Sequence, residues 1–342
     1  MTCANPVPNR IPLAVSIVLG AQDSPSRCLK PSNLQLVYST RPDPKQNKLL
    51  NTAEGVDARL VDKFGRRRFG ICVTPLNLRY DKVYELVQML EFNRLLGASH
   101  VFFYNYTLGD RAASIMDYYY KLYSFVTVVQ WPVPVTVHVW PIPPGHVEEI
   151  HYFAQVPMLN ECLMRAMSRF EYIVYTDLDE FAVPRSAAQG QHTWNDLYEQ
   201  YFSQHKSSLY YFRNTFYKLE WPDDPLTTSN ETIKALQINL LLKTKREPTI
   251  MPSGSRSKMM VRAEDAETVG IHNIWDFRDG VGRTGETVST DVGILHHYRN
   301  WETDPHDPNY VEDRYVPQQY GDEIFARITS AHRTLKERGI VF

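Results

Sequence analysis

The sequence predicts an α/β fold in which helices cover a sheet whose first four strands run parallel. Two observations predict it. Between residues 70 and 176, four short apolar segments alternate with three segments of helical periodicity. The last apolar segment then runs directly into a group of carboxylates. Because ligands of such sheets bind beyond the carboxyl ends of the strands, these carboxylates lie where the fold places its ligand.

The first strand–helix unit covers residues 70–96. Residues 70–76 (GICVTPL) form a short apolar run that Pro75 interrupts, which predicts a buried strand. Residues 81–96 carry apolar side chains on one helical face, with Asp81 as a candidate N-cap. Gly97 follows and is suited to end the helix.

The next unit repeats this alternation. Residues 100–106 (HVFFYNY) and 125–131 (FVTVVQW) are rich in β-branched and aromatic side chains and predict the second and third strands. Residues 110–122 between them predict a helix. Such units join parallel strands through right-handed crossovers.

A proline-rich crossing over residues 132–145 leads to a third helix, for which Pro157 suits the first turn. The apolar stripe of this helix is Leu159, Leu163, Ala166 and Phe170. Residues 172–176 (YIVYT) predict the fourth strand. The later part of the chain has a looser pattern, with short strands at residues 208–219, 258–262 and 293–299 and an amphipathic helix at residues 322–338.

Composition and charge exclude two classes of protein. The chain has 342 residues, of which 43% are hydrophobic and 22% charged, so it can bury a large core. Its 37 basic and 39 acidic residues give a net charge of −2, which argues against a whole-protein affinity for nucleic acid. No apolar run approaches the roughly 18 residues of a membrane helix.

The N-terminal region is irregular. A short apolar run at residues 11–21 is either the core of a signal peptide or a buried strand. Residues 22–69 predict loops with a short strand at residues 34–39. A basic cluster near their end is either a solvated loop or a contact with an anion or a membrane surface. Its members are Lys63, Arg66, Arg67 and Arg68.

Four cysteines are too few for a disulfide scaffold, and none forms a C-x-x-C pair. They are Cys3, Cys28, Cys72 and Cys162. One or two bridges in a secreted protein and buried free thiols are both compatible with this pattern. Two N-glycosylation acceptor sequences, at Asn105 and Asn230, permit a lumenal location.

The acidic segment is Asp177-Leu178-Asp179-Glu180, directly after the fourth strand. Carboxylates this close raise one another's pKa unless a cation neutralises them. In an extended backbone, Asp177 and Asp179 point the same way and offer hard oxygen ligands to magnesium, manganese or calcium. The alternative is an exposed turn whose carboxylates cap the next segment.

The sequence contains no glycine-rich phosphate loop, so a diphosphate at this site would be held mainly through the metal. Two enzyme classes use such an aspartate pair. Haloacid dehalogenase-type phosphatases normally carry it after the first strand of the domain, whereas three strand–helix units come first here. Nucleotide-sugar transferases of the GT-A type carry it after the nucleotide-binding half, which is the order in this chain.

Over about residues 70–300 the chain resembles glycosyltransferase family 92. Single matching segments are short, but their order and spacing together are specific. They are residues 72–76 (CVTPL), 91–93 (EFN), 96–98 (LGA), 101–105 (VFFYN), 160–165 (NECLMR), 177–181 (DLDEF) with Pro184, 258–261 (KMMV), 269–272 (VGIH) and 296–299 (HHYR).

The resemblance implies a GT-A-like, Rossmann-type mixed sheet flanked by helices and an inverting transfer of a sugar, galactose, from a UDP-sugar to a glycan. It also implies Mn²⁺ or Mg²⁺ as cofactor and the Golgi lumen as location, with membrane association only through an anchor that this chain does not display. We expect an N-terminal extension at residues 1–69, a catalytic domain at 70–300 and a C-terminal helical segment at 301–342.

A divalent metal on Asp177 and Asp179 would stabilise the charge on the departing UDP. GT-A enzymes often add a late histidine as a ligand, for which His272 and His297 are the candidates. Either can instead be a hydrogen-bonded structural residue.

Other residues are candidates for the nucleotide and for proton transfer. Thr74, Pro75 and Arg79 follow the first strand, where a uridine normally lies. Arg299 is a candidate contact to phosphate, and Lys258 either neutralises phosphate or is a surface lysine. Arg165 is a candidate salt-bridge partner of the acidic segment.

Inversion needs a general base near the acceptor hydroxyl. Asp276, beside Trp275, and Glu180 are the two candidates, with Asp276 preferred. Two other functions stay open from the sequence: a phosphohydrolase that uses the aspartate pair, and a non-catalytic protein on the same fold that binds carbohydrate or calcium.

Overall fold

The computed structural model describes residues 65–139, 142–185, 192–282, 284–300 and 309–340. The apolar run at residues 11–21, the strand expected at residues 34–39, Lys63, Cys3 and Cys28 lie outside the described residues. Among the helices in the described ranges, none combines the length and apolar character that crossing a membrane requires.

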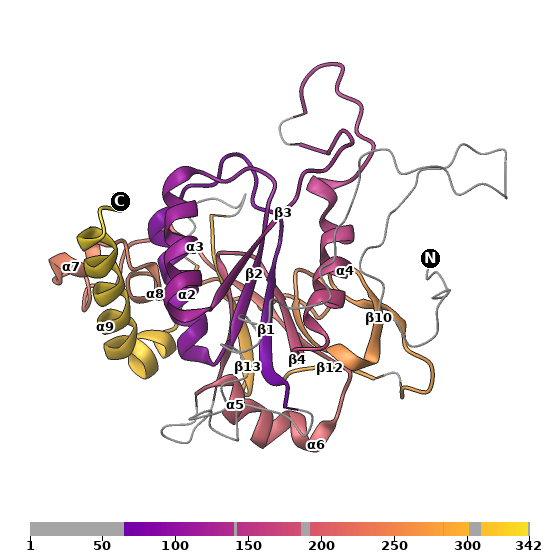
Figure 1. Cartoon of the computed structure of the whole chain (residues 1–342). Helices are drawn as coiled ribbons and strands as arrows, with labels where there is room; N and C mark the ends of the chain where they lie inside the picture. Colours follow the sequence, from indigo (N-terminus) through magenta and orange to yellow (C-terminus); the bar gives the residue numbers. More distant parts are fainter. Residues whose placement is uncertain (1–64, 140–141, 186–191, 283, 301–308, 341–342) are drawn as a thin grey trace. The chain divides into compact units, whose positions relative to one another are not determined.

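A mixed sheet forms the centre of the described part of the chain, as the sequence predicts (Figure 1). Its seven strands lie in the order β12-β6-β9-β4-β1-β2-β3. The first four in sequence are parallel, whereas β9 runs antiparallel to both β4 and β6. The strands are β1 (Arg67–Val73), β2 (His100–Asn105), β3 (Val126–Gln130), β4 (Phe170–Thr176), β6 (Leu209–Phe212), β9 (Lys258–Arg262) and β12 (Gly285–Thr287).

Helices cover both faces of this sheet (Figure 1). On one face, α2 (Val83–Leu96) and α3 (Asp110–Tyr123) pack in a large apolar cluster that also includes α9 (Tyr315–Glu337). On the other face, α4 (Gln155–Ala166) packs in a second cluster with side chains of β1, β4 and β9. Each strand of the sheet centre is therefore buried on both sides, which explains its continuous apolar sequence.

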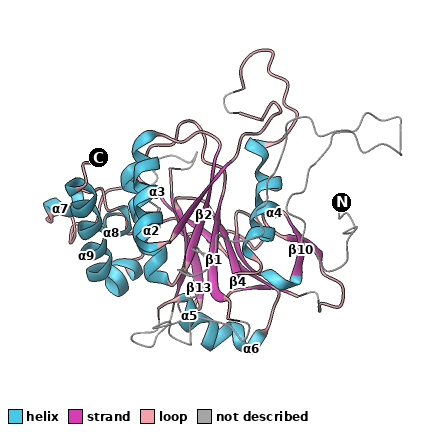
Figure 2. Cartoon of the chain, viewed as in Figure 1, coloured by secondary structure: helices cyan, strands magenta, loops and turns pink. Residues whose placement is uncertain are grey.

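A second, three-stranded sheet adjoins the acidic segment. Its order is β5-β13-β7, with β13 antiparallel to β5 and parallel to β7. Figure 2 shows the remaining elements as short helices and strands. They comprise β5 (Glu180–Pro184), β7 (Asn214–Tyr217), β8 (Lys245–Arg246), β10 (Ala266–Val269), β11 (Ile274–Phe277), β13 (Gly293–Tyr298), β14 (Val311–Glu312), α5 (Trp194–Leu197), α6 (Ser203–His205), α7 (Glu231–Ala235), α8 (Asn239–Leu242) and single helical turns at Tyr152–Ala154, Tyr198–Phe202 and Ala263–Asp265.

Two local predictions are wrong. Asp81 does not cap its own helix, whose N-cap is Lys82. Its carboxylate instead accepts from the backbone N–H of Ala112 and pairs with Arg111 in α3, because the chain enters both helices side by side. Phe170 does not extend the third helix: α4 ends at Ala166, and Phe170 begins β4. The predicted end of α2 is confirmed, since Gly97 has a φ of 109°.

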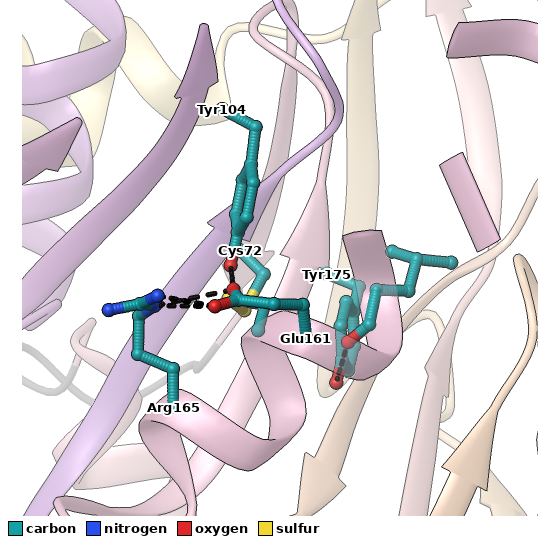
Figure 3. Close-up of a disulfide and its surroundings, with 7 residues drawn as sticks. Cys72, Tyr104, Glu161, Arg165 and Tyr175 are labelled. Carbon is teal, nitrogen blue, oxygen red and sulfur yellow. Dashed lines mark hydrogen bonds and ion pairs between the residues drawn. A yellow bond between two sulfur atoms is a disulfide. The ribbon is translucent and has the colours of Figure 1, made fainter. Parts of the chain in front are cut away.

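A disulfide joins β1 to α4 across the second apolar cluster. It links Cys72 and Cys162, which are 90 residues apart in sequence (Figure 3). Next to it, Tyr104 donates to Glu161, which also pairs with Arg165 one turn later on α4. Arg165 thus pairs with Glu161 of its own helix and also interacts with Tyr104 of β2, while its pairing with the acidic segment stays a prediction.

Candidate active site

The acidic segment is a tight turn that joins the two sheets. β4 ends at Thr176 and β5 begins at Glu180, so the carboxyl edge of the parallel strands leads straight into the second sheet. The strands on either side bring their own polar residues to this turn. Thr74 follows β1, and Lys258 is the first residue of antiparallel β9.

Asp177 is bound on both carboxylate oxygens. Its Oδ1 accepts from the Thr74 hydroxyl at 2.6 Å, and its Oδ2 lies 2.8 Å from Lys258 Nζ. These three residues come from adjacent strands, in the register that pairs Val73 with Thr176 and Tyr175 with Met259. Burial opposes ionisation, but the ammonium and the hydroxyl outweigh it and lower the pKa of the Asp177 carboxyl.

Lys258 is not the surface lysine that the sequence allows. Its side chain is 8% exposed, and its ammonium also lies 3.1 Å from Glu180 Oε2. Burial alone would lower the pKa of Lys258, yet the two carboxylates raise it above its ordinary value. The cation that the acidic segment needs is therefore supplied, in part, by this lysine.

Glu180 is enclosed. Its side chain is 3% exposed, and its oxygens face Lys258, the backbone N–H of Asp177 and, at 3.3 Å, His297 Nδ1. Burial and the neighbouring Asp177 raise the pKa of Glu180, while Lys258 and His297 oppose the rise. A carboxylate with these contacts holds the turn together and has no open path to an acceptor.

Asp179 points away from this cluster toward His297 of β13. The two side chains approach to 3.6 Å between Oδ2 and Nε2. His297 faces the turn because it lies opposite Glu180 in the β5–β13 register. Its Nδ1 side is held by Asn214 at 3.0 Å and by Glu180.

The donor set at Asp179 fits a divalent metal. His297 Nε2 is buried and has no hydrogen-bond partner among the described residues, and it faces a carboxylate oxygen. In this structure Nδ1 accepts from the Asn214 side-chain N–H and lies 3.3 Å from Glu180, so metal binding through Nε2 requires the tautomer whose Nδ1–H faces Glu180. Within the described ranges no group of three or more His, Cys, Asp or Glu side chains is placed to hold a metal ion, so Asp179 and His297 would supply two ligands only. Remaining positions would come from the substrate and water.

His272 lies in the turn between β10 and β11, and its Nδ1 approaches the Ser257 carbonyl at 2.9 Å. Asn160 of α4 fixes this hairpin, because its amide accepts from the N–H and donates to the carbonyl of Val269. Burial and the nearby Lys258 lower the pKa of His272, and the Ser257 carbonyl opposes this. His272 is thus near the acidic turn, while His297 is the histidine in contact with it.

Asp276 and Trp275 are successive exposed residues of β11, at a register shift in its pairing with β10. That they act together on an acceptor sugar stays a prediction. The Trp275 indole lies over Gly270, where an added Cβ would come within 2.1 Å of its ring nitrogen. Asp276 accepts from the Thr268 hydroxyl at 2.7 Å and is exposed.

The predicted nucleotide contacts lie at the same edge of the sheet. Thr74 and Pro75 follow β1, and Pro75 is buried. Arg79 is exposed, and its backbone N–H donates to Thr107 after β2. Arg299 follows β13 directly and is exposed.

Two functional positions were not found by sequence reasoning. Asn214, which is fully buried, orients His297, and Asn160 holds the hairpin of His272. Asn160 lies in one of the segments that carry the family resemblance, and this signal could have identified it. Asn214 has no comparable signal, because only the pairing of β7 with β13 brings it to the histidine.

Comparison with known proteins identifies a family. The model of "Glycosyltransferase family 92" matches residues 67–334. No curated protein matches the chain as a relative.

Solved structures match at low identity. S. aureus TarS is 14% identical over 57% of this chain and 28% of that chain, with a TM-score of 0.31. HddC from Yersinia pseudotuberculosis is 9% identical over 75% of this chain and 98% of that chain, with a TM-score of 0.33. A shorter TarS structure, 1–349, is 13% identical over 78% and 72%, with a TM-score of 0.32. The chain thus spans about a quarter of full TarS, and TM-scores of this size carry no functional argument.

Proposed function

Since the chain belongs to glycosyltransferase family 92, we propose that it transfers a sugar from a UDP-sugar to a glycan hydroxyl with inversion at the anomeric carbon. Membership of this family shows that the chain is a glycosyltransferase. UDP as the carrier, galactose as the sugar and inversion are our proposals, made on the resemblance of the motifs. A hydroxyl-bearing glycan is the proposed acceptor.

The observation that carries the proposal is the contact between Asp179 and His297. A carboxylate oxygen and an unpartnered, buried imidazole nitrogen face each other at the ligand-binding edge of the sheet. Carboxylates suit Mg²⁺ and Mn²⁺, whereas an added imidazole favours Mn²⁺ over Mg²⁺. Bound there, the metal would supply Lewis-acid stabilisation of the charge on the leaving UDP.

The chain's own residues have distinct proposed roles at this edge. Asp179 and His297 hold the metal, with Glu180 and Asn214 orienting the imidazole. Thr74 and Lys258 hold the Asp177 carboxylate in a fixed orientation beside the metal. Thr74, Pro75 and Arg79 border the uridine, and Arg299 contacts a phosphate oxygen. His272 lines the nucleotide side near Lys258.

The proton of the acceptor hydroxyl must leave toward a base on the face opposite UDP. Of the two candidates from the sequence, Glu180 is enclosed by Lys258 and His297. Asp276 is exposed, and one of its carboxylate oxygens accepts a hydrogen bond from the Thr268 hydroxyl. Of these two residues, Asp276 therefore remains the candidate general base.

We propose the lumen of the secretory pathway as the location, and the Golgi as its compartment. The Cys72–Cys162 disulfide supports this, because such bridges persist in oxidising compartments and are rare in the cytosol.

The experiment that tests the function is release of UDP from a panel of UDP-sugars, with Mn²⁺ and a mixture of glycan acceptors. We expect release with one sugar, loss of release with EDTA, and recovery with added Mn²⁺. Asp179→Ala should lower the rate at least a hundredfold, whereas Asp117→Ala, on the exposed side of α3, should leave it unchanged. Folded protein that releases UDP from no sugar would refute the proposal.

A further inference from the structure

A small chamber lies beside Asp179, lined by neither Thr74 nor Lys258. Its volume is about 20 Å³. That is room for one water or one hydroxyl group, and not for a sugar ring. The polar groups that line it are the Asp179 carboxylate, Glu85 and Gln88 of α2, and Asn239 of α8.

A larger cavity adjoins this chamber. Its volume is about 390 Å³, in the range of small-ligand sites, and it shares Leu219 and Asn239 with the walls of the chamber. Charged and amide side chains line it, although Asp223 pairs with Lys243 at 2.6 Å and Lys234 with Glu231 at 2.8 Å, so a ligand rich in hydroxyls would share these groups. They are Asp223, Lys234, Gln237 and Lys243.

Glu85 is positioned to act on a group in the small chamber. It lies in the first turn of α2, where the helix dipole stabilises a carboxylate. Its side chain is 26% exposed, so one face remains open. The Tyr80 hydroxyl donates to its Oε1 at 3.2 Å, and Lys82 Nζ lies 3.3 Å from its Oε2. These contacts fix the carboxylate without enclosing it, in contrast to Glu180.

We propose that the acceptor sugar binds in the larger cavity, that its reacting hydroxyl enters the small chamber, and that Glu85 is the general base. This rests on the proposed function. The Glu85 carboxylate takes the hydroxyl proton while the acceptor oxygen bonds to the anomeric carbon. The bond from that carbon to the β-phosphate oxygen breaks, and UDP leaves with its electron pair. The acceptor oxygen and the leaving UDP are then on opposite faces of the anomeric carbon, as inversion requires.

The test compares Glu85→Gln, Asp276→Asn and the exposed control Glu323→Gln on α9, with the donor that the wild type uses and a glycan acceptor. We expect Glu85→Gln to lower kcat by 10²–10⁴-fold while UDP binding, measured by calorimetry, changes less than about twofold. Glu323→Gln should match the wild type. A Glu85→Gln enzyme within about threefold of wild-type kcat, or loss of rate in Asp276→Asn alone, overturns the proposal.

A second variant tests the larger cavity independently of Glu85. Lys234→Ala is at a half-exposed position and should raise the acceptor KM at least fivefold, with kcat and the donor KM nearly unchanged. An unchanged acceptor KM contradicts the acceptor cavity. If Glu85→Gln melts below the assay temperature, Glu85→Asp replaces it, with the same expected split between kcat and UDP binding. Failure of the wild type to use any donor would refute the proposed function itself, so the two failures are distinguishable.

Discussion

Two carboxylates of the acidic turn share one buried ammonium, and the third faces a histidine. Lys258 bridges Asp177 and Glu180, which leaves Asp179 as the carboxylate that faces His297. Asp177 and Glu180 thus have a structural role in the turn, while the Asp179 carboxylate is not paired with this lysine. Removing Lys258 should therefore affect stability first.

We expect Lys258→Met to lower the free energy of unfolding by about 3–5 kcal/mol, because it leaves a buried carboxylate unpaired. Urea unfolding monitored by circular dichroism measures it. Lys121→Met removes an exposed partner of Asp117 in α3 and should cost less than about 1 kcal/mol. Equal effects of the two variants would show that Lys258 has no special role in the turn.

At this scale the sequence predicts residue types better than their partners. It identifies the acidic segment, both histidines and Lys258 as a cluster of interest. It does not predict that Lys258 pairs with Asp177, because their contact depends on β9 lying antiparallel beside β4. It also does not predict the register shift between β10 and β11 at Trp275 and Asp276, because that irregularity depends on how the two strands pair.

The elements that carry the site are largely predictable, and their errors lie at their ends. The strand–helix alternation from β1 to β4 follows from apolar periodicity, which is strong where both faces are buried. The end of the third helix was misplaced because Phe170 continues its spacing although it starts β4. The second sheet has short strands with little periodicity, so its pairing depends on tertiary contacts.

The disulfide ties two of these elements together. Cys72 lies in β1, which leads to Thr74, and Cys162 lies in α4, which carries Asn160. The bridge therefore fixes α4, on one face of the sheet, to the strand that leads into the site. The sequence left bridged and free thiols equally open, since spacing alone does not specify pairing.

We expect the double variant Cys72→Ala/Cys162→Ala to lose about 2–5 kcal/mol of unfolding free energy, because the bridge closes a long loop. Thermal unfolding of the oxidised wild type, of the wild type in dithiothreitol and of the variant provides the measurement. Reduced wild type and variant should both melt well below the oxidised protein. Identical melting of all three would mean that the bridge adds nothing to stability.

At the scale of the whole molecule, the comparison with family 92 covers nearly all of the described residues. The division into residues 1–69, 70–300 and 301–342 stays a prediction. Within the described part, α9 shares an apolar cluster with α2. Composition correctly indicates a large core, but it does not reveal how many ionisable groups that core holds. Three of the buried histidines, His100, His296 and His332, are the clearest case.

Those histidines predict that the protein loses stability as the pH falls. Burial lowers the pKa of His100 and of His296 to about 3, and that of His332 to about 4. In the unfolded chain each has a pKa near 6.5. Above pH 6.5 all three are neutral in both states, so their contribution is flat. Between pH 6.5 and the folded pKa values, only the unfolded chain binds the three protons, which favours unfolding.

We expect the three histidines together to lower the free energy of unfolding by roughly 6 kcal/mol between pH 7 and pH 5, about 2 kcal/mol each. Glu180, whose pKa burial raises, opposes this toward the acid end. Urea unfolding at pH 7, 6 and 5 measures the slope. In His332→Phe, which keeps a ring against Tyr84, about one third of the pH dependence should disappear. A slope that this substitution leaves unchanged would mean that His332 is protonated in the folded protein, and so is not held neutral by burial.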